Sequence, residues 1–143
     1  MSAMPSNLEV IRATYEGPSE QNGKNLIAAL APDAVWVEAE GFPYAGTYTG
    51  PENIIANVFR RLATEWIDYR AEVASYVVEG DQVVAFGVYS GTYKATGKAM
   101  RAAFAHHYRL REGKIVRMMQ YVDSHMVQQA LLPRSAGALP GQT

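Results

Sequence analysis

The turn at residues 112–113 constrains the fold most strongly, because it joins two long segments with the composition of β-strands. Residues 98–110 and 114–123 are rich in aromatic and β-branched side chains, and the Glu-Gly pair between them favours a hairpin. A two-residue turn fixes the register of a hairpin, in which side chains alternate between the two faces. The predicted cross-strand pairs are Leu110 with Ile115, Tyr108 with Arg117, His106 with Met119, Phe104 with Tyr121, and Ala102 with Asp123.

This register places polar side chains on one face of an otherwise apolar hairpin. Counted from the turn, His106, Tyr121 and Asp123 share that face. Titratable groups are costly to bury in a solid apolar core, so the pattern predicts a lined pocket. At about 3.4 Å per residue, His106 and Asp123 leave the sheet roughly 13 Å apart. We therefore expect no direct His–Asp pair, but a pocket with one group at each end and the Tyr121 hydroxyl between them.

Length and charge limit the class of protein. A chain of 143 residues fits one domain, and a domain of this size buries about 68–70% of its unfolded surface. The absence of cysteine excludes disulfides, thiolate nucleophiles and zinc fingers. The net charge of −1 argues against a nucleic-acid partner, and no apolar run approaches the roughly 20 residues of a membrane helix. We expect a soluble, cytoplasmic protein with neither a nucleic-acid nor a membrane partner.

Hydrophobic periodicity predicts helices in the first half of the chain and strands in the second. The expected helices span residues 7–16, 21–30, 51 to about 62, and 126–132. The expected strands span residues 33–38, 68–78, 82–94, 98–110 and 114–123. Residues 41–50 are expected to form a glycine-rich loop. A single domain is predicted for residues 1–132 and a disordered tail for 133–143, and helices followed by hairpins indicate the α+β class.

Four stretches of the sequence carry a resemblance to a known family. They are residues 32–38 (PDAVWVE), 44–51 (YAGTYTGP), 104–115 (FAHHYRLREGKI) and 120–123 (QYVD). With this order of elements, residues 8–131 resemble the family that includes nuclear transport factor 2, ketosteroid isomerase and the polyketide cyclases related to SnoaL. The resemblance implies a cone-shaped α+β barrel, in which a curved antiparallel sheet wraps around helices and encloses an internal pocket. Because this fold hosts isomerases, cyclases, dehydratases and non-enzymatic binders, it does not by itself determine the reaction.

The resemblance suggests three catalytic side chains, each with a structural alternative. Glu38 ends the first strand, where ketosteroid isomerases place an aspartate general base; the alternative is a solvated glutamate. His106 lies where the isomerases keep a protonated aspartate that donates to the oxyanion; the alternative is a histidine paired within the core. Asp123 matches the acid/base aspartate of SnoaL-type cyclases; the alternative is the N-cap of the last helix.

Aromatic side chains are expected to shape the pocket, since phenols keep a wall apolar while offering hydroxyls to a ligand. Tyr15 lies near the position of the oxyanion tyrosine of the isomerases. Tyr44 and Tyr48 flank the glycine-rich loop, which is a candidate lid. The full set of expected substrate-binding residues is Tyr15, Trp36, Tyr44, Tyr48, Phe104, Met119 and Tyr121.

Neither a metal nor a cofactor is expected. His106, Asp123 and His125 have suitable donor atoms, but their spacing along the hairpin is too long for one metal ion. The chain has no His-Glu-x-x-His, no Gly-x-Ser-x-Gly and no Walker A motif. The sequence therefore gives no signature of nucleotide or metal chemistry.

The opposite face of the predicted hairpin is too apolar for a fully solvated surface, and we predict that it forms a homodimer contact. Its expected members are Ala105, His107, Arg109, Val116, Met118 and Gln120. For function, we predict a cofactor-free proton-transfer enzyme of isomerase, cyclase or hydratase type, acting on a small hydrophobic carbonyl or hydroxyl compound. The alternative is a non-catalytic ligand-binding or protein-association module of the same fold.

Overall fold

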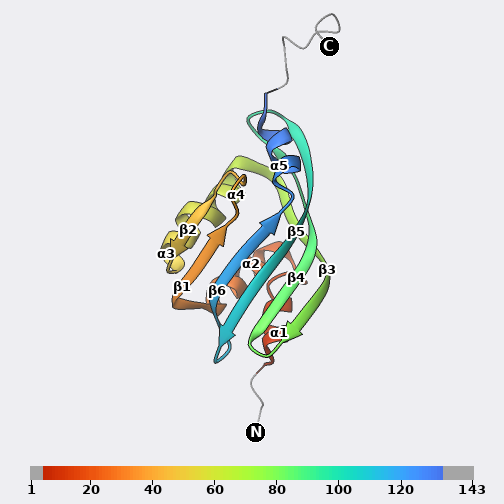
Figure 1. Cartoon of the computed structure of the whole chain (residues 1–143). Coiled ribbons are helices and arrows are strands. Elements are labelled where there is room, and N and C mark those ends of the chain that lie inside the picture. The colour runs from red at the N-terminus through yellow and green to blue at the C-terminus, as the bar shows by residue number, and fades with distance from the viewer. Residues whose placement is uncertain (1–4, 134–143) are drawn as a thin grey trace, which may run out of the picture.

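The computed structural model describes residues 5–133 (Figure 1). The helical elements are α1 (Asn7–Arg12), α2 (Ser19–Ala29), α3 (Pro51–Ile54), the π-helix η1 (Ile55–Phe59), α4 (Arg60–Glu65) and α5 (Ser124–Leu131). The strands are β1 (Leu30–Glu38), β2 (Gly46–Thr49), β3 (Trp66–Glu79), β4 (Gln82–Tyr93), β5 (Lys98–Arg111) and β6 (Lys114–Val122). Apart from Pro133, the tail predicted for residues 133–143 lies outside the described residues.

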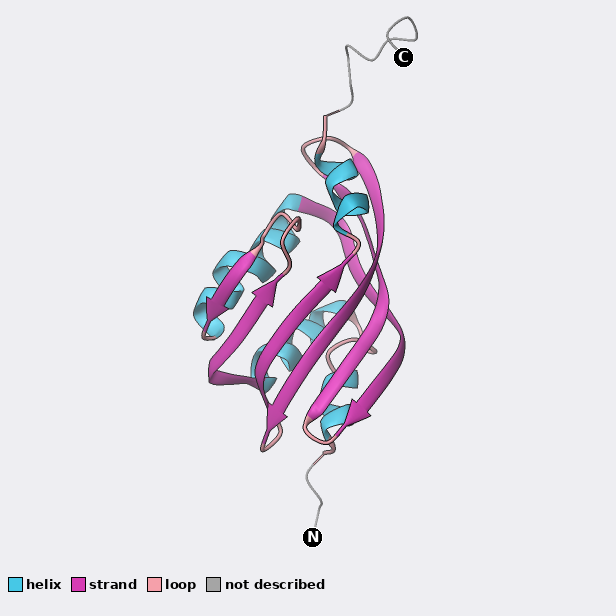
Figure 2. Cartoon of the chain, viewed as in Figure 1, coloured by secondary structure: helices cyan, strands magenta, loops and turns pink. Residues whose placement is uncertain are grey.

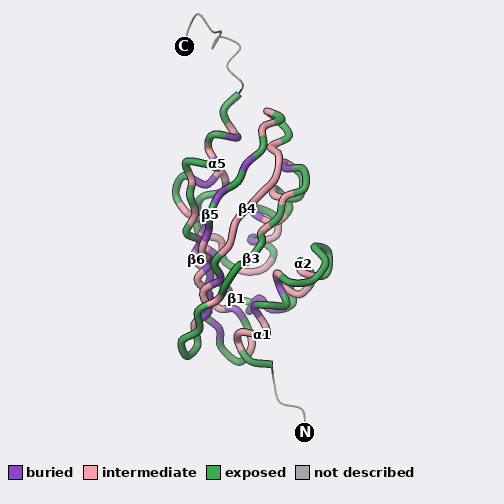
Figure 3. Tube along the Cα trace, turned by 90° about the vertical axis from the view of Figure 1, so that its right-hand side faces the viewer, coloured by how far each residue is buried: buried purple, intermediate pink, exposed green. Residues whose placement is uncertain are grey.

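The strands form one curved 6-stranded sheet in the order β2-β1-β6-β5-β4-β3 (Figure 2). Neighbouring strands are antiparallel except β1 and β6, which run parallel. Helices α1 and α2 lie against one face of the sheet, as the turned view in Figure 3 shows. The predicted α+β fold, a curved sheet wrapped around helices, is therefore confirmed. The glycine-rich loop differs from expectation, because part of it pairs with β1 as the short strand β2.

Local sequence signals explain where the helices begin. The Ser6 hydroxyl accepts from the Glu9 backbone N–H, and the Glu9 carboxylate accepts from the Ser6 N–H, which together form a capping box for α1. Pro51 opens α3, where its missing N–H costs no hydrogen bond. The inner side of the helical run that follows is buried through Ile54 and Val58. None of the helices between residues 5 and 133 is long and apolar enough to cross a membrane.

The turn between β5 and β6 has the backbone that the sequence predicts. Glu112 has φ of 51° and Gly113 has φ of 76°, as in the hairpin turns whose twist matches that of the strands. Leu110 pairs with Ile115, which confirms the first predicted cross-strand pair.

Beyond that pair the predicted register is wrong. Arg109 pairs with Arg117, so Val116 is an extra residue on β6 and forms a β-bulge. The observed pairs are Tyr108 with Met118, His107 with Met119, His106 with Gln120, Ala105 with Tyr121, and Phe104 with Val122. A shift of one residue moves every following side chain to the other face of a strand.

The bulge changes which side chains of β6 face the interior. Met118 and Gln120 are 0% and 3% exposed, whereas Tyr121 is 53% exposed on the outer face. The predicted homodimer face is therefore incorrect at Met118 and Gln120. Met119 and Tyr121 take their places on the outside, beside His107 of β5.

Two apolar clusters hold the helices to the sheet. In the first, Trp36 and Tyr108 of the sheet pack with Ile11 of α1 and with Val58 of η1. The second gathers at the other end, over α5 and the β4–β5 hairpin, and its members are Phe42, Tyr44, Trp66, Tyr89, Met100, Ala102, Phe104, Val127 and Ala130. The space between sheet and helices is only partly filled by these clusters, which leaves room for a cavity.

We predict that Met118→Ala lowers the free energy of unfolding by about 2–5 kcal/mol, because it leaves a void in the core. The neighbouring change Met119→Ala, on the outer face, should cost less than about 1 kcal/mol. Urea unfolding of both variants, followed by circular dichroism, measures the difference. The bulge-free register predicts the opposite ranking, so a larger loss for Met119→Ala would contradict the structure.

Candidate functional site

A cavity of about 630 Å³ lies between the sheet and the helices. Its apolar wall is built by Leu26, Ile27, Trp36, Val58, Phe59, Leu62, Ala63 and Trp66. Its polar lining includes Tyr15, Glu38, Tyr69, Tyr89, His106 and Tyr108. A largely apolar cavity of this size, with a few convergent polar groups, is typical of a small-molecule site.

Glu38 ends β1 with its side chain inside the molecule, only 4% exposed. The alternation of the strand explains this, since Ala34, Trp36 and Glu38 share the buried face. The indole N–H of Trp36 donates to the Glu38 Oε2 at 3.2 Å. Burial raises the pKa of Glu38 to about 8, against a smaller lowering by that indole N–H. The carboxyl therefore exchanges its proton near neutral pH, and the alternative of a solvated glutamate is wrong.

His106, on β5, is held from both sides by tyrosine hydroxyls. Its Nδ1 lies 2.5 Å from the Tyr15 Oη, and its Nε2 is hydrogen bonded to the hydroxyl of Tyr89. Tyr15 is also hydrogen bonded to the hydroxyl of Tyr108. The imidazole stacks on the ring of Phe104, with 4.2 Å between centroids. The ring therefore has a fixed position and a fully occupied hydrogen-bonding capacity.

The site has little formal charge near neutral pH. Burial lowers the pKa of His106 to about 3, so the imidazole is neutral. Burial also raises the pKa of Tyr15, Tyr89 and Tyr108, which keeps all three phenols protonated. These groups act as hydrogen-bond donors and acceptors rather than as ions, and Glu38 is the group that changes charge in this range.

The hydrogen bonds continue from Tyr89 to a residue of β6. The Gln120 amide nitrogen donates to the Tyr89 Oη at 2.8 Å, and the Gln120 Oε1 accepts from the Ala39 backbone N–H at 3.0 Å. Gln120 reaches this position because the bulge turns it inward. The network thereby connects β1, β6, β4 and β5 with the end of the first helical segment.

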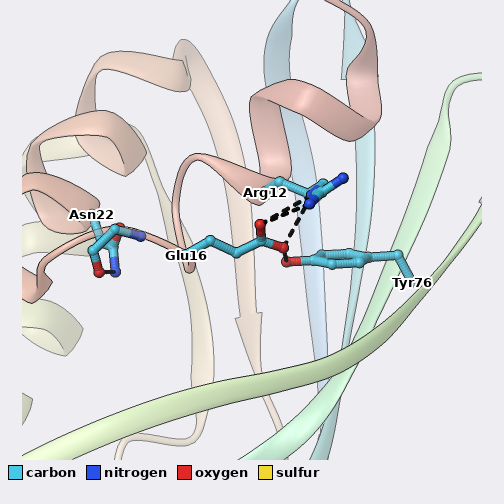
Figure 4. A network of polar contacts seen from close by, with 5 residues as sticks. Arg12, Glu16, Asn22 and Tyr76 are labelled. Carbon is cyan, nitrogen blue, oxygen red and sulfur yellow. Dashed lines mark hydrogen bonds and ion pairs between the residues drawn. The ribbon is translucent and has the colours of Figure 1, made fainter.

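Two groups of polar contacts hold the segment that contains Tyr15, one made by Asn22 of α2 and one by Glu16, and Figure 4 shows these two side chains. The Asn22 side chain donates to the carbonyls of Tyr15 and Gly17 and accepts from the Gly17 N–H. Next to it, the Glu16 carboxylate accepts from Arg12 and from the Tyr76 hydroxyl of β3, as Figure 4 shows. These contacts tie the segment to the sheet and to α2, so the Tyr15 hydroxyl has a defined place over His106.

The structure gathers some of the predicted site residues and separates others. Glu38, His106, Tyr15 and Trp36 line the cavity together. Phe104 was also expected to contact the substrate, but it lies outside the lining and stacks on the imidazole of His106 instead. The remaining candidates that sequence reasoning placed in the pocket lie outside its lining, namely Tyr44, Tyr48, Met119, Tyr121 and Asp123.

Each of these exclusions has a local cause. Tyr44 is buried in the second cluster, where its hydroxyl donates to the Glu65 carboxylate at 2.8 Å and accepts from the Trp66 indole. Tyr48 donates to the Tyr44 carbonyl, so neither tyrosine acts as a lid over the cavity. The Asp123 side chain is exposed and accepts from the Met126 N–H as the N-cap of α5, which is the structural alternative.

Met119 and Tyr121 are excluded by the bulge, which turns both outward. There the Tyr121 hydroxyl lies 3.1 Å from the Met119 sulfur. The suggested group of metal donors is also dispersed, since His106 is buried while Asp123 and His125 are exposed at the start of α5. Within residues 5–133, no three His, Asp or Glu side chains are placed to hold one metal ion.

Among the polar groups of the site that sequence reasoning missed are Tyr69, Tyr89, Tyr108 and Gln120. The signal for Tyr108 was present, since it lies two residues after His106 and shares its face in a strand. Tyr69 and Tyr89 lie on predicted strands, but their inward direction depends on cross-strand pairing. Gln120 was assigned to the wrong face because of the bulge.

Comparison with known proteins identifies the family. The family model of the SnoaL-like domain matches residues 11–118. Among solved structures, an NTF2-like protein from Burkholderia thailandensis E264 is 38% identical, with 91% of this chain and 100% of that chain covered and a TM-score of 0.86. The chain therefore belongs to the SnoaL-like family, within the NTF2-like superfamily. No curated protein gives a significant match.

Two further structures of this fold contain small ligands. TerC, co-crystallised with polyporic acid, is 26% identical, with 87% of this chain and 97% of that chain covered and a TM-score of 0.76. A protein of ketosteroid isomerase-like fold from Catenulispora acidiphila DSM 44928, in complex with trimethylamine, is 23% identical. The match covers 92% of this chain and 96% of that chain, with a TM-score of 0.70. At this identity the similarity shows only that the two proteins share a fold.

The ionisation of Glu38 predicts a pH dependence of stability. Folding raises its pKa from 4.5 to about 8, so between these values the folded protein keeps a proton that the unfolded chain loses. The free energy of unfolding should therefore fall as pH rises from 4.5 to 8, on the order of 5 kcal/mol in total from this group. Glu38→Gln should remove that slope, and urea unfolding of parent and variant across this range measures it.

The difference between parent and variant isolates Glu38 from other groups. The lowered pKa of His106 works in the opposite direction, since its contribution is lost as pH falls from 6.5 towards 3 in both proteins. A stability difference that does not change between pH 4.5 and 8 would show that Glu38 has an ordinary pKa.

Proposed function

We propose that the protein catalyses proton transfer beside a carbonyl group of a small, uncharged, apolar compound, in an isomerisation, cyclisation or hydration that needs no cofactor. The observation that supports this most is the composition of one cavity. A buried carboxyl, Glu38, faces the same space as the hydroxyls of Tyr15 and Tyr108. A proton acceptor and a hydrogen-bond donor held in place by a second hydroxyl are the groups that enolisation requires.

Glu38 is the proposed general base. Its second oxygen, Oε1, has no hydrogen-bond partner in residues 5–133. Every fully buried side-chain oxygen or nitrogen in this part of the chain does have a partner, so Oε1 is not fully buried. The Oε1 is therefore open to the cavity rather than enclosed by protein. With a pKa near the working pH, the carboxylate takes a proton from the carbon beside the carbonyl and returns it at a second position.

Tyr108 is the proposed oxyanion donor, and Tyr15, hydrogen bonded to its hydroxyl, holds it in place. As the carbon loses its proton, the electron pair moves to the carbonyl oxygen, which becomes an enolate oxygen. The Tyr108 hydroxyl, already fixed by its hydrogen bond with Tyr15, stabilises this charge without reorganising. His106 is neutral, and in this proposal it orients Tyr15 rather than delivering a positive charge.

The substrate class follows from the walls of the cavity. Trp36, Phe59 and Leu62 offer an apolar surface, and a volume of about 630 Å³ suits a small ring system. An anionic group would lose its hydration at the buried end without a cation to pair with, and a cationic group would pair with the Glu38 carboxylate and occupy the proposed base, so the proposed reaction favours an uncharged substrate. The presence of polyporic acid in TerC supports the binding of small molecules in this fold.

The second candidate function is non-catalytic binding. It is favoured by the fact that buried polar groups within residues 5–133 are already satisfied by one another. In that case the tyrosines and Glu38 orient a guest without chemistry. Proton exchange in a bound ketone distinguishes the two functions, because a binder has no need to move protons.

The activity test uses exchange of α-hydrogens for deuterium in a panel of small cyclic ketones, followed by proton NMR. We expect the parent protein to accelerate exchange in at least one ketone, and Glu38→Gln to lower the rate by about 10²–10⁴-fold because it removes the base. Tyr108→Phe should lower it by about 10²–10³-fold because it removes one oxyanion donor.

The matched control is Asp123→Asn, which keeps a good N-cap and lies outside the cavity, so exchange should not change. If Asp123→Asn lowers exchange as much as Glu38→Gln, the proposed base is wrong. If the parent binds these ketones but exchanges none of them, the binding function is favoured.

The homodimer remains a proposal, with its surface redefined by the bulge. On the outer face, Ala105 of β5 pairs with Phe86 of β4 on one side and with Tyr121 of β6 on the other. Phe86 and Tyr121 are 40% and 53% exposed, and an exposed apolar sheet face of this kind suits a two-fold contact.

We predict that Phe86→Glu dissociates the dimer, because it places a charge without a partner in an apolar contact. Ile27→Glu is the matched control, since Ile27 is 41% exposed but lies on α2, against the other face of the sheet. Sedimentation equilibrium of the parent and both variants measures the effect. A monomeric parent, or equal dissociation by Ile27→Glu, would argue against this face.

A further inference from the structure

A continuous chain of hydrogen bonds crosses the polar wall of the cavity. It runs from the Gln120 amide to Tyr89, from Tyr89 to His106, from His106 to Tyr15, and from Tyr15 to Tyr108. Hydroxyls can donate or accept, and a neutral imidazole donates from one nitrogen only. Each hydrogen bond of this chain could therefore run in either direction, and the groups at the two ends of the chain decide which partner donates.

One end of the chain has a fixed direction. The Ala39 backbone N–H can only donate, and it donates to the Gln120 Oε1 at 3.0 Å. This contact orients the amide group, so the Gln120 nitrogen faces Tyr89 and donates to its Oη at 2.8 Å. Gln120 is 3% exposed, so both contacts lie inside the protein.

The fixed direction of this first hydrogen bond determines which partner donates in each of the following ones. The Tyr89 hydroxyl accepts from the Gln120 N–H and from the neighbouring Tyr69 hydroxyl, so it donates its own hydrogen to the His106 Nε2. A neutral imidazole that accepts at Nε2 has its hydrogen at Nδ1, which donates to Tyr15. The Tyr15 hydroxyl in turn donates to Tyr108.

We propose that Gln120 is a positioning residue that holds His106 as the Nδ1–H tautomer and leaves the Tyr108 hydroxyl as the terminal donor of the chain. Tyr108 lines the cavity, and its hydroxyl has no acceptor among the side chains of residues 5–133. The ligand atom that meets it must accept a hydrogen bond, as a carbonyl or enolate oxygen does. This consequence rests on the function proposed above, whereas the tautomer does not.

The tautomer can be measured directly in the parent protein. Long-range proton–nitrogen NMR of protein with ¹⁵N-labelled histidine distinguishes a protonated ring nitrogen from an unprotonated one. The chain has three histidines, and His106→Asn identifies the signals of His106. We expect the hydrogen at Nδ1 and an unprotonated Nε2 that accepts from Tyr89. The hydrogen at Nε2 in the parent would overturn the proposal without any further variant.

Gln120→Glu tests whether Gln120 sets the direction. An ionised carboxylate keeps the contact with the Ala39 N–H but cannot donate to Tyr89, so the Tyr89 hydroxyl donates to the carboxylate instead. Tyr89 then accepts from His106, and the imidazole hydrogen moves from Nδ1 to Nε2. The measurement is made near pH 10, because buried glutamates ionise as high as about 8–9.

The matched control is Gln82→Glu. The Gln82 Oε1 is hydrogen bonded to the His107 Nε2 at 2.7 Å on the outer face, so this variant makes the same chemical change beside a histidine outside the chain. Parent and control are measured at the same pH, since Glu38 is also ionised there. A His106 hydrogen that stays at Nδ1 in folded Gln120→Glu, or moves in Gln82→Glu, would overturn the proposal. If Gln120→Glu does not fold, the tautomer of the parent decides.

Discussion

The bulge at Val116 is the constraint on which the site depends. One extra residue in β6 reverses the faces of all residues that follow it, so Met118 completes the core and Gln120 enters the polar network. Without the bulge, Tyr121 would face the interior in place of Gln120, and the amide that satisfies Tyr89 would point to the outside. The same shift places Met119 and Tyr121 on the outer face and thereby defines the surface available for association. A local irregularity of one strand thus determines which side chains line the inside of the sheet and which are exposed on its outer face.

Burial determines the charge state of the site. Removal from water disfavours the ionised form of every group, which lowers the pKa of His106 and raises that of Glu38 and of the tyrosines. The groups remain stable inside because each hydrogen bonds to another, and such networks tolerate no missing partner. The outcome is a buried end of the cavity that is polar but nearly uncharged, with Glu38 able to change its protonation near neutral pH, while the charged lining residues Asp68, Arg70 and Glu72 are exposed. This combination favours chemistry in which a proton moves between carbon and carboxylate while a neutral donor array receives the developing charge.

Membership of the SnoaL-like family establishes the fold, and the fold is compatible with several functions. The particular side chains carry the functional argument. Glu38 faces the cavity, whereas Asp123 caps α5, so the geometry favours a base on β1 over one at the end of β6. The segment from Glu16 to Asn22 contributes as well, because its polar contacts hold Tyr15 over the imidazole. The cavity is lined by groups from both the sheet and the helices. The hydrogen bond from Tyr76 of β3 to Glu16 holds the first helical segment against the sheet at this cavity.

Much of this molecule was determined by short-range signals in the sequence. The capping box of Ser6 and Glu9, Pro51 at a helix start, the alternation that buries Trp36 and Glu38, and the turn at Glu112 and Gly113 all act through neighbours in the chain, so they were predictable. The tertiary structure decided what depends on contacts between distant residues. The bulge has no strong local signal in the sequence, because the free energy of forming it depends on how β6 pairs with β5 and β1. The inward position of Gln120 follows from that pairing, and that of Tyr89 follows from the pairing of β4 with β5. The N-cap at Asp123 is by contrast a local contact with Met126, and the sequence offered it as an alternative. Local propensity specifies which residues form a strand, but only the packed sheet specifies which of its faces meets the cavity.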